Sequence, residues 1–178
     1  MNYEILQDTS PKEELLIKLI ESKTLNILID DSFTEDLIQV LFRAVQLYSK
    51  KVDRNAHIGI HGLDGKEEAI TKLAKHYHYD KIIDYISRTD HPKLLSYFLG
   101  CDVFISNDHD SFGIGFAGEV FLPRICMNTE YDGRLIEGVF YVGMDESSLA
   151  SILTIIKKKT YRDQLSGHTA LIRLGDTK

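Results

Sequence analysis

The chain has 178 residues, of which 43% are hydrophobic, enough for one sizeable hydrophobic core and too few for two ordinary domains. Acidic residues outnumber Lys and Arg by 27 to 21, which gives a formal net charge of -6. A broad nucleic-acid-binding surface needs an excess of basic residues, so this composition argues against nucleic acid as a partner.

The two cysteines, Cys101 and Cys126, lie in apolar segments and lack the spacing of a metal site. We expect both to be small buried side chains in a reducing compartment. The N-terminus does not resemble a signal peptide, and no apolar run approaches the ~18 residues that a bilayer-spanning helix needs. We therefore expect a cytoplasmic protein with no integral membrane segment, whose contact with a membrane would be peripheral and made through a partner.

The chain begins with a segment that shows no periodic pattern. Residues 1–10 carry polar and turn-forming types, and we expect them to form an N-terminal linker. From Ser10 and Pro11 onward, which together mark a helix start, apolar residues recur at helical spacing. We therefore expect a single folded domain over residues 11–178.

A strand and a helix are predicted next. The apolar run from Leu25 to Ile29 has the length and composition of a buried strand. Ser32 and Glu35 then have the spacing of a capping box, in which each side chain satisfies the backbone amide of the other residue. The helix that this motif would open carries apolar residues at helical spacing, namely Leu37, Val40, Leu41, Ala44, Val45 and Tyr48.

This unit of strand and helix repeats along the rest of the chain. Further strands are predicted at His57 to Ile60, Lys81 to Ile86, Asp102 to Ser106, Arg124 to Met127 and Phe140 to Val142. Further helices are predicted at Lys66 to His78, His91 to Leu99, Ile114 to Phe121 and after Asp145. The alternation predicts a Rossmann-like α/β fold of three layers, in which about six mostly parallel strands are covered by helices on both faces.

The most informative segment runs from Leu99 to Glu119. It predicts a buried strand, a polar loop and a helix whose start contains glycine. In order, it contains Cys101-Asp102-Val103-Phe104, Ser106, Asp110, Ser111-Phe112-Gly113 and Glu119. This order resembles the core of the family 4 glycosyltransferases, which carry similar strand residues, a Ser, an acid, Phe-Gly and a second acid in the following helix. The resemblance extends from about Pro11 to Ser166.

The resemblance implies the C-terminal, nucleotide-sugar-binding half of a retaining GT-B glycosyltransferase of glycan or polysaccharide biosynthesis. The donor would be a nucleotide sugar, without a further cofactor or a metal ion, and an acceptor-binding N-terminal half would come from elsewhere in a longer chain or from a partner. The implied donor-binding residues are Asp110, Ser111, Phe112, Gly113, Ile114, Glu119, Ser87 and Arg88.

Physical chemistry supports these implied roles. Amides at a helix start present unpaired donors and a positive dipole end to a diphosphate. Glycine at position 113 would let the ligand approach the backbone closely. In the family, the acid that corresponds to Glu119 accepts hydrogen bonds from the ribose hydroxyls.

Two features depart from the family pattern. Asp110 and Glu119 are nine positions apart, whereas the family has eight, and the first acid is Asp rather than Glu. The family also places an Arg and a Lys after its first strand, where they neutralise the leaving diphosphate. The corresponding stretch here has no basic residue and four acids, Asp30, Asp31, Glu35 and Asp36. Because carboxylates repel a diphosphate, we expect the isolated chain to bind nucleotide sugars weakly or not at all and to show no transferase activity.

Three alternatives stay open. If the chain does bind a diphosphate, Arg88 or Arg134 would supply the missing positive charge. Asp108-His109-Asp110 has the spacing of the metal-binding Asp-x-Asp motif of a different glycosyltransferase class. Finally, the chain can be a non-catalytic scaffold or binding subunit of the same fold that has lost donor binding.

Overall fold

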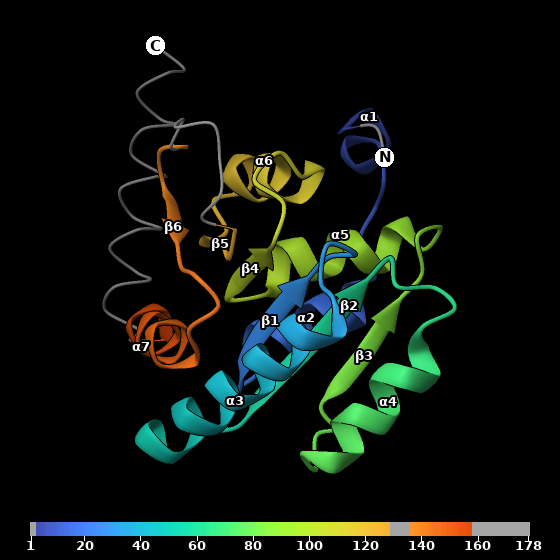
Figure 1. The fold of residues 1–178 in the computed structure, drawn as a ribbon. Helices are drawn as coiled ribbons and strands as arrows, with labels where there is room; N and C mark the ends of the chain where they lie inside the picture. The colour runs from blue at the N-terminus through green and yellow to red at the C-terminus, as the bar shows by residue number, and fades with distance from the viewer. Residues whose placement is uncertain (1–2, 129–135, 158–178) are drawn as a thin grey trace.

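In the computed structural model, residues 3–128 and 136–157 are described. Within these ranges, six parallel strands form one sheet in the order β3-β2-β1-β4-β5-β6 (Figure 1). The strands are β1 (Leu25–Ile29), β2 (Ala56–His61), β3 (Ile83–Ile86), β4 (Val103–Ser106), β5 (Arg124–Cys126) and β6 (Val139–Tyr141). The predicted fold class and strand number are confirmed.

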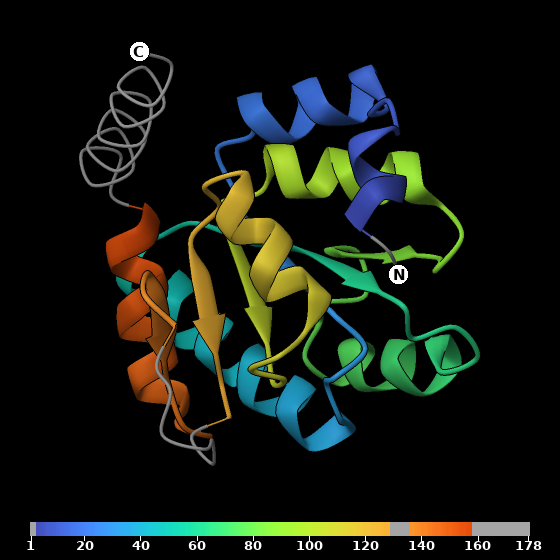
Figure 2. The ribbon, with the colours of Figure 1, turned by 90° about the horizontal axis from the view of Figure 1, so that it is seen from above.

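The helices cover both faces of the sheet. They are α1 (Tyr3–Gln7), α2 (Glu13–Glu21), α3 (Glu35–Val52), α4 (Glu67–His76), α5 (His91–Gly100), α6 (Phe112–Glu119) and α7 (Glu146–Lys157). Figure 2 shows α1, α2 and α5 on one side of the strands and α3 and α4 on the other. Helix α6 belongs to the same hydrophobic core as α5, and α7 belongs to the same core as α3. The molecule therefore has the three layers that alternating strands and helices predict.

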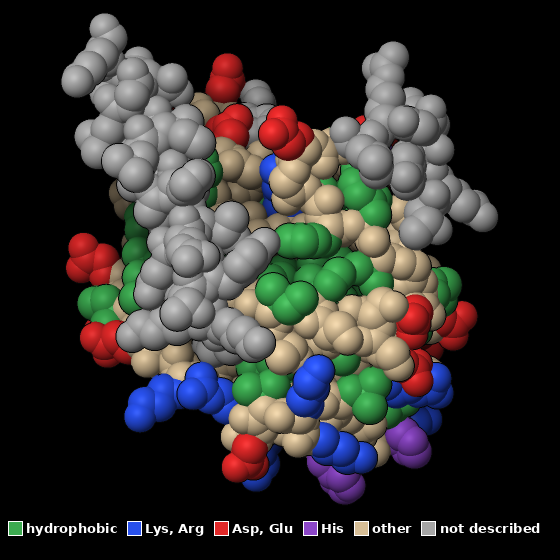
Figure 3. Space-filling model, turned by 90° about the vertical axis from the view of Figure 1, so that its left-hand side faces the viewer, with side chains coloured by type: hydrophobic (Ala, Val, Ile, Leu, Met, Phe, Trp, Pro, Cys, Tyr) green, Lys and Arg blue, Asp and Glu red, His purple; other side chains and the backbone are tan. Residues whose placement is uncertain are grey.

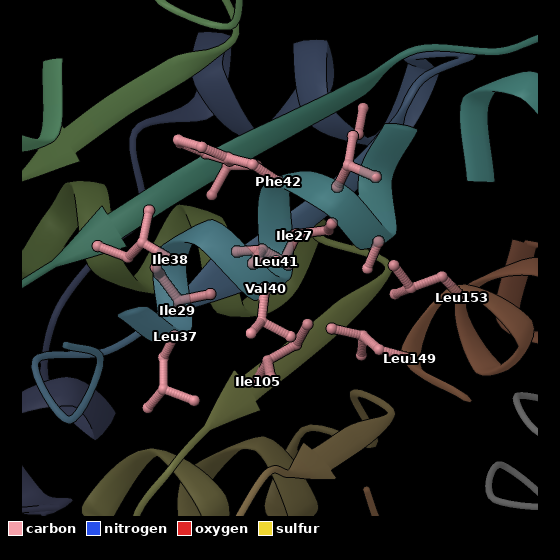
Figure 4. Close-up of a cluster of buried hydrophobic side chains, with 14 of the residues drawn as sticks. Ile27, Ile29, Leu37, Ile38, Val40, Leu41, Phe42, Ile105, Leu149 and Leu153 are labelled. Atoms are coloured by element: carbon pink, nitrogen blue, oxygen red, sulfur yellow. The ribbon is translucent and has the colours of Figure 1, made fainter. Parts of the chain in front are cut away.

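Strand β1 lies at the centre of the sheet and is buried on both faces. Its residues Ile27 and Ile29 pack toward α3 and α7, as Figure 4 shows, while Leu28 belongs to the core under α5 and α6. Each of these three side chains is completely buried. A strand covered on both faces needs a continuous apolar run rather than an alternating one, which explains why this strand was predictable from sequence.

The strand order defines where a ligand can bind. β1 and β4 are neighbours, with Ile27 opposite Val103 and Ile29 opposite Ile105, although they are far apart in the chain. The connections that leave these two strands run in opposite directions along the sheet, and such a switch point opens a crevice at the carboxyl ends of the strands. The loops after β1 and β4 therefore border this crevice.

The predicted capping box is wrong. Helix α3 is capped by Thr34, whose Oγ1 accepts a hydrogen bond from the amide of Leu37 at 3.3 Å. Ser32 lies two residues too early to cap this helix, and its hydroxyl bonds to Asp30 and Ser106 instead. Both Ser32 and Thr34 suit a cap, so only the position at which the backbone becomes helical separates them.

Two further boundaries differ from expectation. The expected linker contains helix α1, whose Leu6 is buried in the core beneath α5. Helix α6 begins at Phe112 rather than at Ile114, because Ser111 caps it by accepting a hydrogen bond from the Ile114 amide at 3.2 Å. The helix ends at Glu119 rather than at the predicted Phe121.

The outer surface agrees with the overall charge. Figure 3 shows the molecule from its β6 and α7 side, where hydrophobic side chains gather at the centre and acidic and basic side chains both lie around them. This face is not the single basic surface that nucleic-acid binding requires. Cys101 and Cys126 are buried and not disulfide-bonded, as predicted. None of the helices in the described ranges is long and apolar enough to cross a membrane.

Candidate functional site

A cavity of about 340 Å³ lies at the carboxyl edge of the sheet, next to the switch point. Its polar lining consists of Asp30, Asp31, His61, Arg88, His91 and Ser111. Its apolar lining consists of Ile5, Leu94, Phe98, Phe104, Phe112 and Gly113. The loops that follow the strands, the starts of α5 and α6 and the short helix α1 thus all contribute to one site.

Asp30 anchors a hydrogen-bond network that joins the loops after β1 and β4. Its carboxylate accepts from the Ser32 amide at 3.1 Å, from the Ser32 hydroxyl, and from the Ser106 hydroxyl at 2.6 Å. The Ser32 hydroxyl in turn accepts from the Asn107 amide at 2.8 Å. Burial raises the pKa of Asp30, and the hydrogen bonds from Ser106 and Ser32 oppose that rise. The network fixes the shape of the cavity floor.

Arg88 lies in the loop after β3 and lines the cavity. Its Nη2 donates to Asp31 Oδ2 at 3.1 Å and its Nε donates to the Gly62 carbonyl at 2.9 Å. Gly62 has a positive φ of 81°, and a Cβ there would lie 3.2 Å from the Asp31 Cβ. The side chains of Arg88 and Asp31 are 63% and 53% exposed, so their ion pair is weak and a ligand can compete for either partner.

His61 is the last residue of β2, and its imidazole forms part of the cavity wall. Burial lowers the pKa of His61, and the nearby Arg88 and His91 add to that effect, while Asp31 and Asp64 oppose it. The imidazole is therefore uncharged at neutral pH. Its Nε2 is buried and has no hydrogen-bond partner among the residues that the structure describes.

The start of α6 closes the apolar side of the cavity. The rings of Phe98 and Phe104 lie 5.4 Å apart, and those of Phe98 and Phe112 lie 6.4 Å apart in an edge-to-face arrangement. A Cβ at Gly113 would lie 2.2 Å from the Phe104 ring. The glycine at this position is thus required by packing against Phe104, whereas the sequence suggested close approach of a ligand.

The structure brings half of the predicted donor-binding residues into the cavity lining. Arg88, Ser111, Phe112 and Gly113 line it. Asp110, Ile114, Glu119 and Ser87 do not belong to its lining. The side chain of Asp110 is 92% exposed, Ile114 is buried in the core, and Glu119 and Ser87 are exposed.

Of the four acidic residues that follow β1, two line the cavity and two do not. Asp30 and Asp31 line the cavity, whereas Glu35 and Asp36 are exposed in the first turn of α3 and lie outside its lining. Arg134 lies outside the described residues. Sequence reasoning did not find His61, His91, Phe98 or Phe104 as site residues, although it did find Phe112. The one available signal was that His61 and Arg88 follow predicted strands, which places them at the ligand-binding edge.

The Asp-x-Asp segment has other structural partners. Asp108 Oδ1 accepts from the Asp110 amide at 3.0 Å, which closes a tight turn. His109 Nδ1 lies 2.7 Å from the hydroxyl of Tyr141 on β6. No group of three or more potential metal-binding side chains occurs within residues 3–128 and 136–157. This segment thus forms a structural turn that ties the loop after β4 to β6.

Glycosyltransferases of known structure share this fold. The C-terminal domain of LpcC, a group 1 family glycosyl transferase from Francisella tularensis, is 17% identical with a TM-score of 0.53, over 88% of this chain and 94% of that domain. WaaG, a glycosyltransferase involved in lipopolysaccharide biosynthesis, is 16% identical with a TM-score of 0.58, over 87% of this chain and 44% of WaaG. S. aureus TarM, solved in complex with UDP, is 13% identical with a TM-score of 0.60, over 81% of this chain and 31% of TarM.

These similarities define the class of fold. It is a Rossmann-like α/β domain that matches the C-terminal domain of GT-B glycosyltransferases. The chain spans less than half of the length of WaaG and of TarM, and nearly the whole length of the LpcC domain. The sequence matches no protein-family model and no curated protein.

Proposed function

We propose that this chain is the nucleotide-sugar-binding half of a retaining GT-B glycosyltransferase of glycan or polysaccharide biosynthesis, similar to family 4 and with a weakened diphosphate site. The observation that supports this proposal most is the cavity at the switch point, in a fold that LpcC and WaaG share. An acceptor-binding half, from a longer chain or a partner, would complete the catalytic cleft. We expect this function to be cytoplasmic, with any membrane contact made through the partner.

In this proposal the start of α6 faces the donor. Ser111, Phe112 and Gly113 line the cavity, and the first amides of a helix have no partner within it. The Ile114 amide already donates to Ser111, so Ile114 contributes packing and no hydrogen bond to the ligand. A donor would meet Asp110, Glu119 or Ser87 only where it extends past the cavity.

Charge sets the expected strength of binding. The cavity contains the carboxylates of Asp30 and Asp31, and its guanidinium, Arg88, is already paired with Asp31. A diphosphate must therefore displace Asp31 from Arg88 and remain close to both acids. We propose that this arrangement weakens donor binding without abolishing it, and that Arg88 is the cation that meets the phosphates.

The proposal is tested by measuring the melting temperature with UDP-, GDP- and ADP-sugars at low salt. A ligand at ten times its Kd stabilises the folded chain by about 1.4 kcal/mol, which raises Tm by roughly 3 to 6 °C for a domain of this size. We expect one base to give such a shift at millimolar concentration. Absence of any shift, both in this chain and in an Asp31→Asn variant with a less acidic cavity, would favour the non-catalytic subunit instead.

A further inference from the structure

A second cavity, of about 300 Å³, lies at the amino ends of β1, β2 and β3, at the edge of the sheet opposite the proposed donor site. Its lining includes Asn26 of β1, His57 of β2 and Asp84 of β3, together with Tyr97 of α5. Helix α2 contributes Lys18. The two cavities share no lining residue, so this one requires a separate explanation.

A chain of hydrogen bonds runs along the wall of this second cavity. Lys93 Nζ donates to Asp84 Oδ1 at 2.7 Å, and the Tyr97 hydroxyl donates to Asp84 Oδ2 at 2.8 Å. His57 Nε2 lies 2.7 Å from the same hydroxyl. Burial, with the nearby charge of Asp84, raises the pKa of Tyr97, so this hydroxyl keeps its proton at neutral pH. Both carboxylate oxygens of Asp84 thus already accept from the protein.

This chain fixes the position of the proton on His57. A tyrosine hydroxyl has one proton, and Tyr97 gives it to Asp84, so its oxygen accepts from His57 Nε2–H. Burial lowers the pKa of His57, which keeps the ring neutral at neutral pH. The charge of Asp84 opposes this effect, whereas the charges of Lys18 and Lys93 add to it. Nδ1 of the neutral ring is therefore a hydrogen-bond acceptor.

This Nδ1 atom is accessible to a ligand. The Tyr97 hydroxyl bonds to the other ring nitrogen of His57, and no side chain in the described ranges bonds to Nδ1. Within those ranges, the buried side-chain atoms without a partner are Tyr48 Oη and His61 Nε2, so solvent reaches Nδ1 of His57. Because the ring lines the cavity, a molecule bound there can donate to it.

The charges of the lining favour an anionic molecule. Lys18 and Lys81 line the cavity, and neither forms an ion pair with a residue that the structure describes. The acid of the lining, Asp84, is already paired with Lys93 at 2.7 Å. Two lysines without a counter-charge therefore stand beside the acceptor nitrogen of His57.

A ligand of this cavity has to meet two requirements at once, a negative charge for the lysines and a proton for Nδ1. Carboxylates and sulfate carry the charge, but near neutral pH they have no proton to donate. A phosphate monoester meets both requirements, because its second pKa is about 6 and its monoanion combines one P–OH group with charged oxygens. Inorganic phosphate has the same combination of groups.

We propose that this cavity is a second ligand site, in which Lys18, Lys81 and His57 bind a phosphate monoester or inorganic phosphate. The P–OH group donates to His57 Nδ1, and the charged oxygens face the two lysines. Tyr97 is a positioning residue, because it holds the proton of His57 on the other nitrogen. The inference does not rest on the proposed function, since the diphosphate of a nucleotide sugar is esterified at both ends and carries no such proton.

The test is calorimetry of the full chain at about pH 7, in a buffer free of phosphate and sulfate, with inorganic phosphate, glycerol phosphate and sulfate as probes. We expect a phosphate to bind about fivefold or more tightly than sulfate, which has the same shape and lacks the proton. Tighter binding of glycerol phosphate identifies an ester as the ligand, and tighter binding of inorganic phosphate identifies the unesterified anion.

Variants of the lining show where the phosphate binds. The double variant Lys18→Gln, Lys81→Gln should weaken binding about tenfold, because it removes both unpaired cations. The matched control is Lys51→Gln, Lys75→Gln, which changes the net charge equally at exposed positions outside the lining and should leave the affinity unchanged. His57→Leu should also abolish the preference for phosphate over sulfate.

The ¹⁵N shifts of the His57 ring test the same contact without a substitution. Nε2 should carry the proton in the ligand-free chain, and the Nδ1 signal should move when phosphate is added. The inference is overturned if no phosphate binds, if sulfate binds as tightly, or if binding is unchanged in the Lys18, Lys81 variant or in His57→Leu. A ligand-free ring protonated on Nδ1 would overturn it as well. None of these results depends on whether a nucleotide sugar binds at the opposite edge.

Discussion

The side chain of Asp31 controls the charge that the cavity presents to a diphosphate. It lines the cavity and occupies Arg88 through a 3.1 Å ion pair. Replacing it with Asn removes one carboxylate and releases the guanidinium, so UDP should bind about fivefold more tightly, which corresponds to about 1 kcal/mol. The gain should shrink at high salt, where screening shortens the reach of charge.

Asp36→Asn is the matched control for this prediction. Asp36 is exposed in the first turn of α3 and lies outside the cavity lining, so its replacement should leave UDP affinity within the error of calorimetry. An Asp31→Asn variant that binds UDP more weakly than the original chain would show that Asp31 holds Arg88 in a productive position. The proposed repulsion would then be wrong.

Packing at Gly113 gives a prediction that does not depend on any ligand. A Cβ at this position would lie 2.2 Å from the Phe104 ring, far inside van der Waals contact. Gly113→Ala should therefore lower the free energy of unfolding in urea by about 1 to 3 kcal/mol, the usual cost of overpacking a core. A smaller residue at position 104 should restore part of the loss, so the double variant Gly113→Ala, Phe104→Leu should be more stable than the two separate effects predict. Additive effects would contradict direct contact.

Two partly buried histidines, His57 and His61, predict how the free energy of unfolding changes with pH. Burial lowers the pKa values of His57 and His61 below the ordinary value of 6.5. Above about pH 6.5 neither the folded nor the unfolded chain protonates them. Below about pH 6.5 these two histidines bind protons in the unfolded chain but stay neutral in the folded chain. The free energy of unfolding should therefore fall as the pH falls. Urea titrations between pH 8 and pH 5.5 test this sign.

A histidine variant provides the control for this experiment, and Asp30 contributes a pH dependence of the opposite sign. His61→Gln removes one of the two titrating side chains and should flatten the decline. The raised pKa of Asp30 acts in the opposite direction, because the folded chain protonates it more readily than the unfolded chain does, and it adds stability nearer its ordinary value of 3.8. A free energy of unfolding that rises as the pH falls from 7 to 6 would contradict the lowered pKa values of His57 and His61.

At the level of single elements, the start of α3 shows how a cap determines the neighbouring site. Thr34 Oγ1 accepts from the Leu37 amide, which leaves Ser32 to bind Asp30 and Ser106. Thr34→Ala should lower the free energy of unfolding by about 1 kcal/mol, while Thr34→Ser should retain most of the cap. Equal stability of the Ala and Ser variants in urea would show that Thr34 is not the cap.

The elements also show which boundaries a sequence can predict. β1 was predictable to the residue, because a strand buried on both faces is a continuous apolar run between polar residues. The start of α6 was not, because Ser111 and glycines at 113 and 115 are all compatible with a loop until the cap forms. The helix also ends at Glu119 rather than at the predicted Phe121, and Glu119 lies outside the cavity lining.

For the whole molecule, the alternation of strands and helices was sufficient to predict a parallel sheet and to direct attention to its carboxyl edge, where the cavity lies. It could not predict the composition of that site. His61 and Phe98 line one cavity although they belong to β2 and α5, because the direction of each side chain depends on which helix covers which face. The apolar wall and the unpaired imidazole therefore emerge only from tertiary structure.

The proposed function requires a nucleotide sugar to bind at the carboxyl edge of this sheet. A ¹H–¹⁵N NMR titration of the full chain, with the nucleotide sugar that gives the largest thermal shift, locates the binding site. We predict that the largest amide shift changes occur at His61, Gly62, Arg88, Phe112 and Gly113. A second cavity lies at the opposite edge, lined in part by Asn26, His57 and Asp84, and the amides of these residues should not move. Shift changes centred on that second cavity, with none at the carboxyl edge, would show that the donor does not bind where we propose.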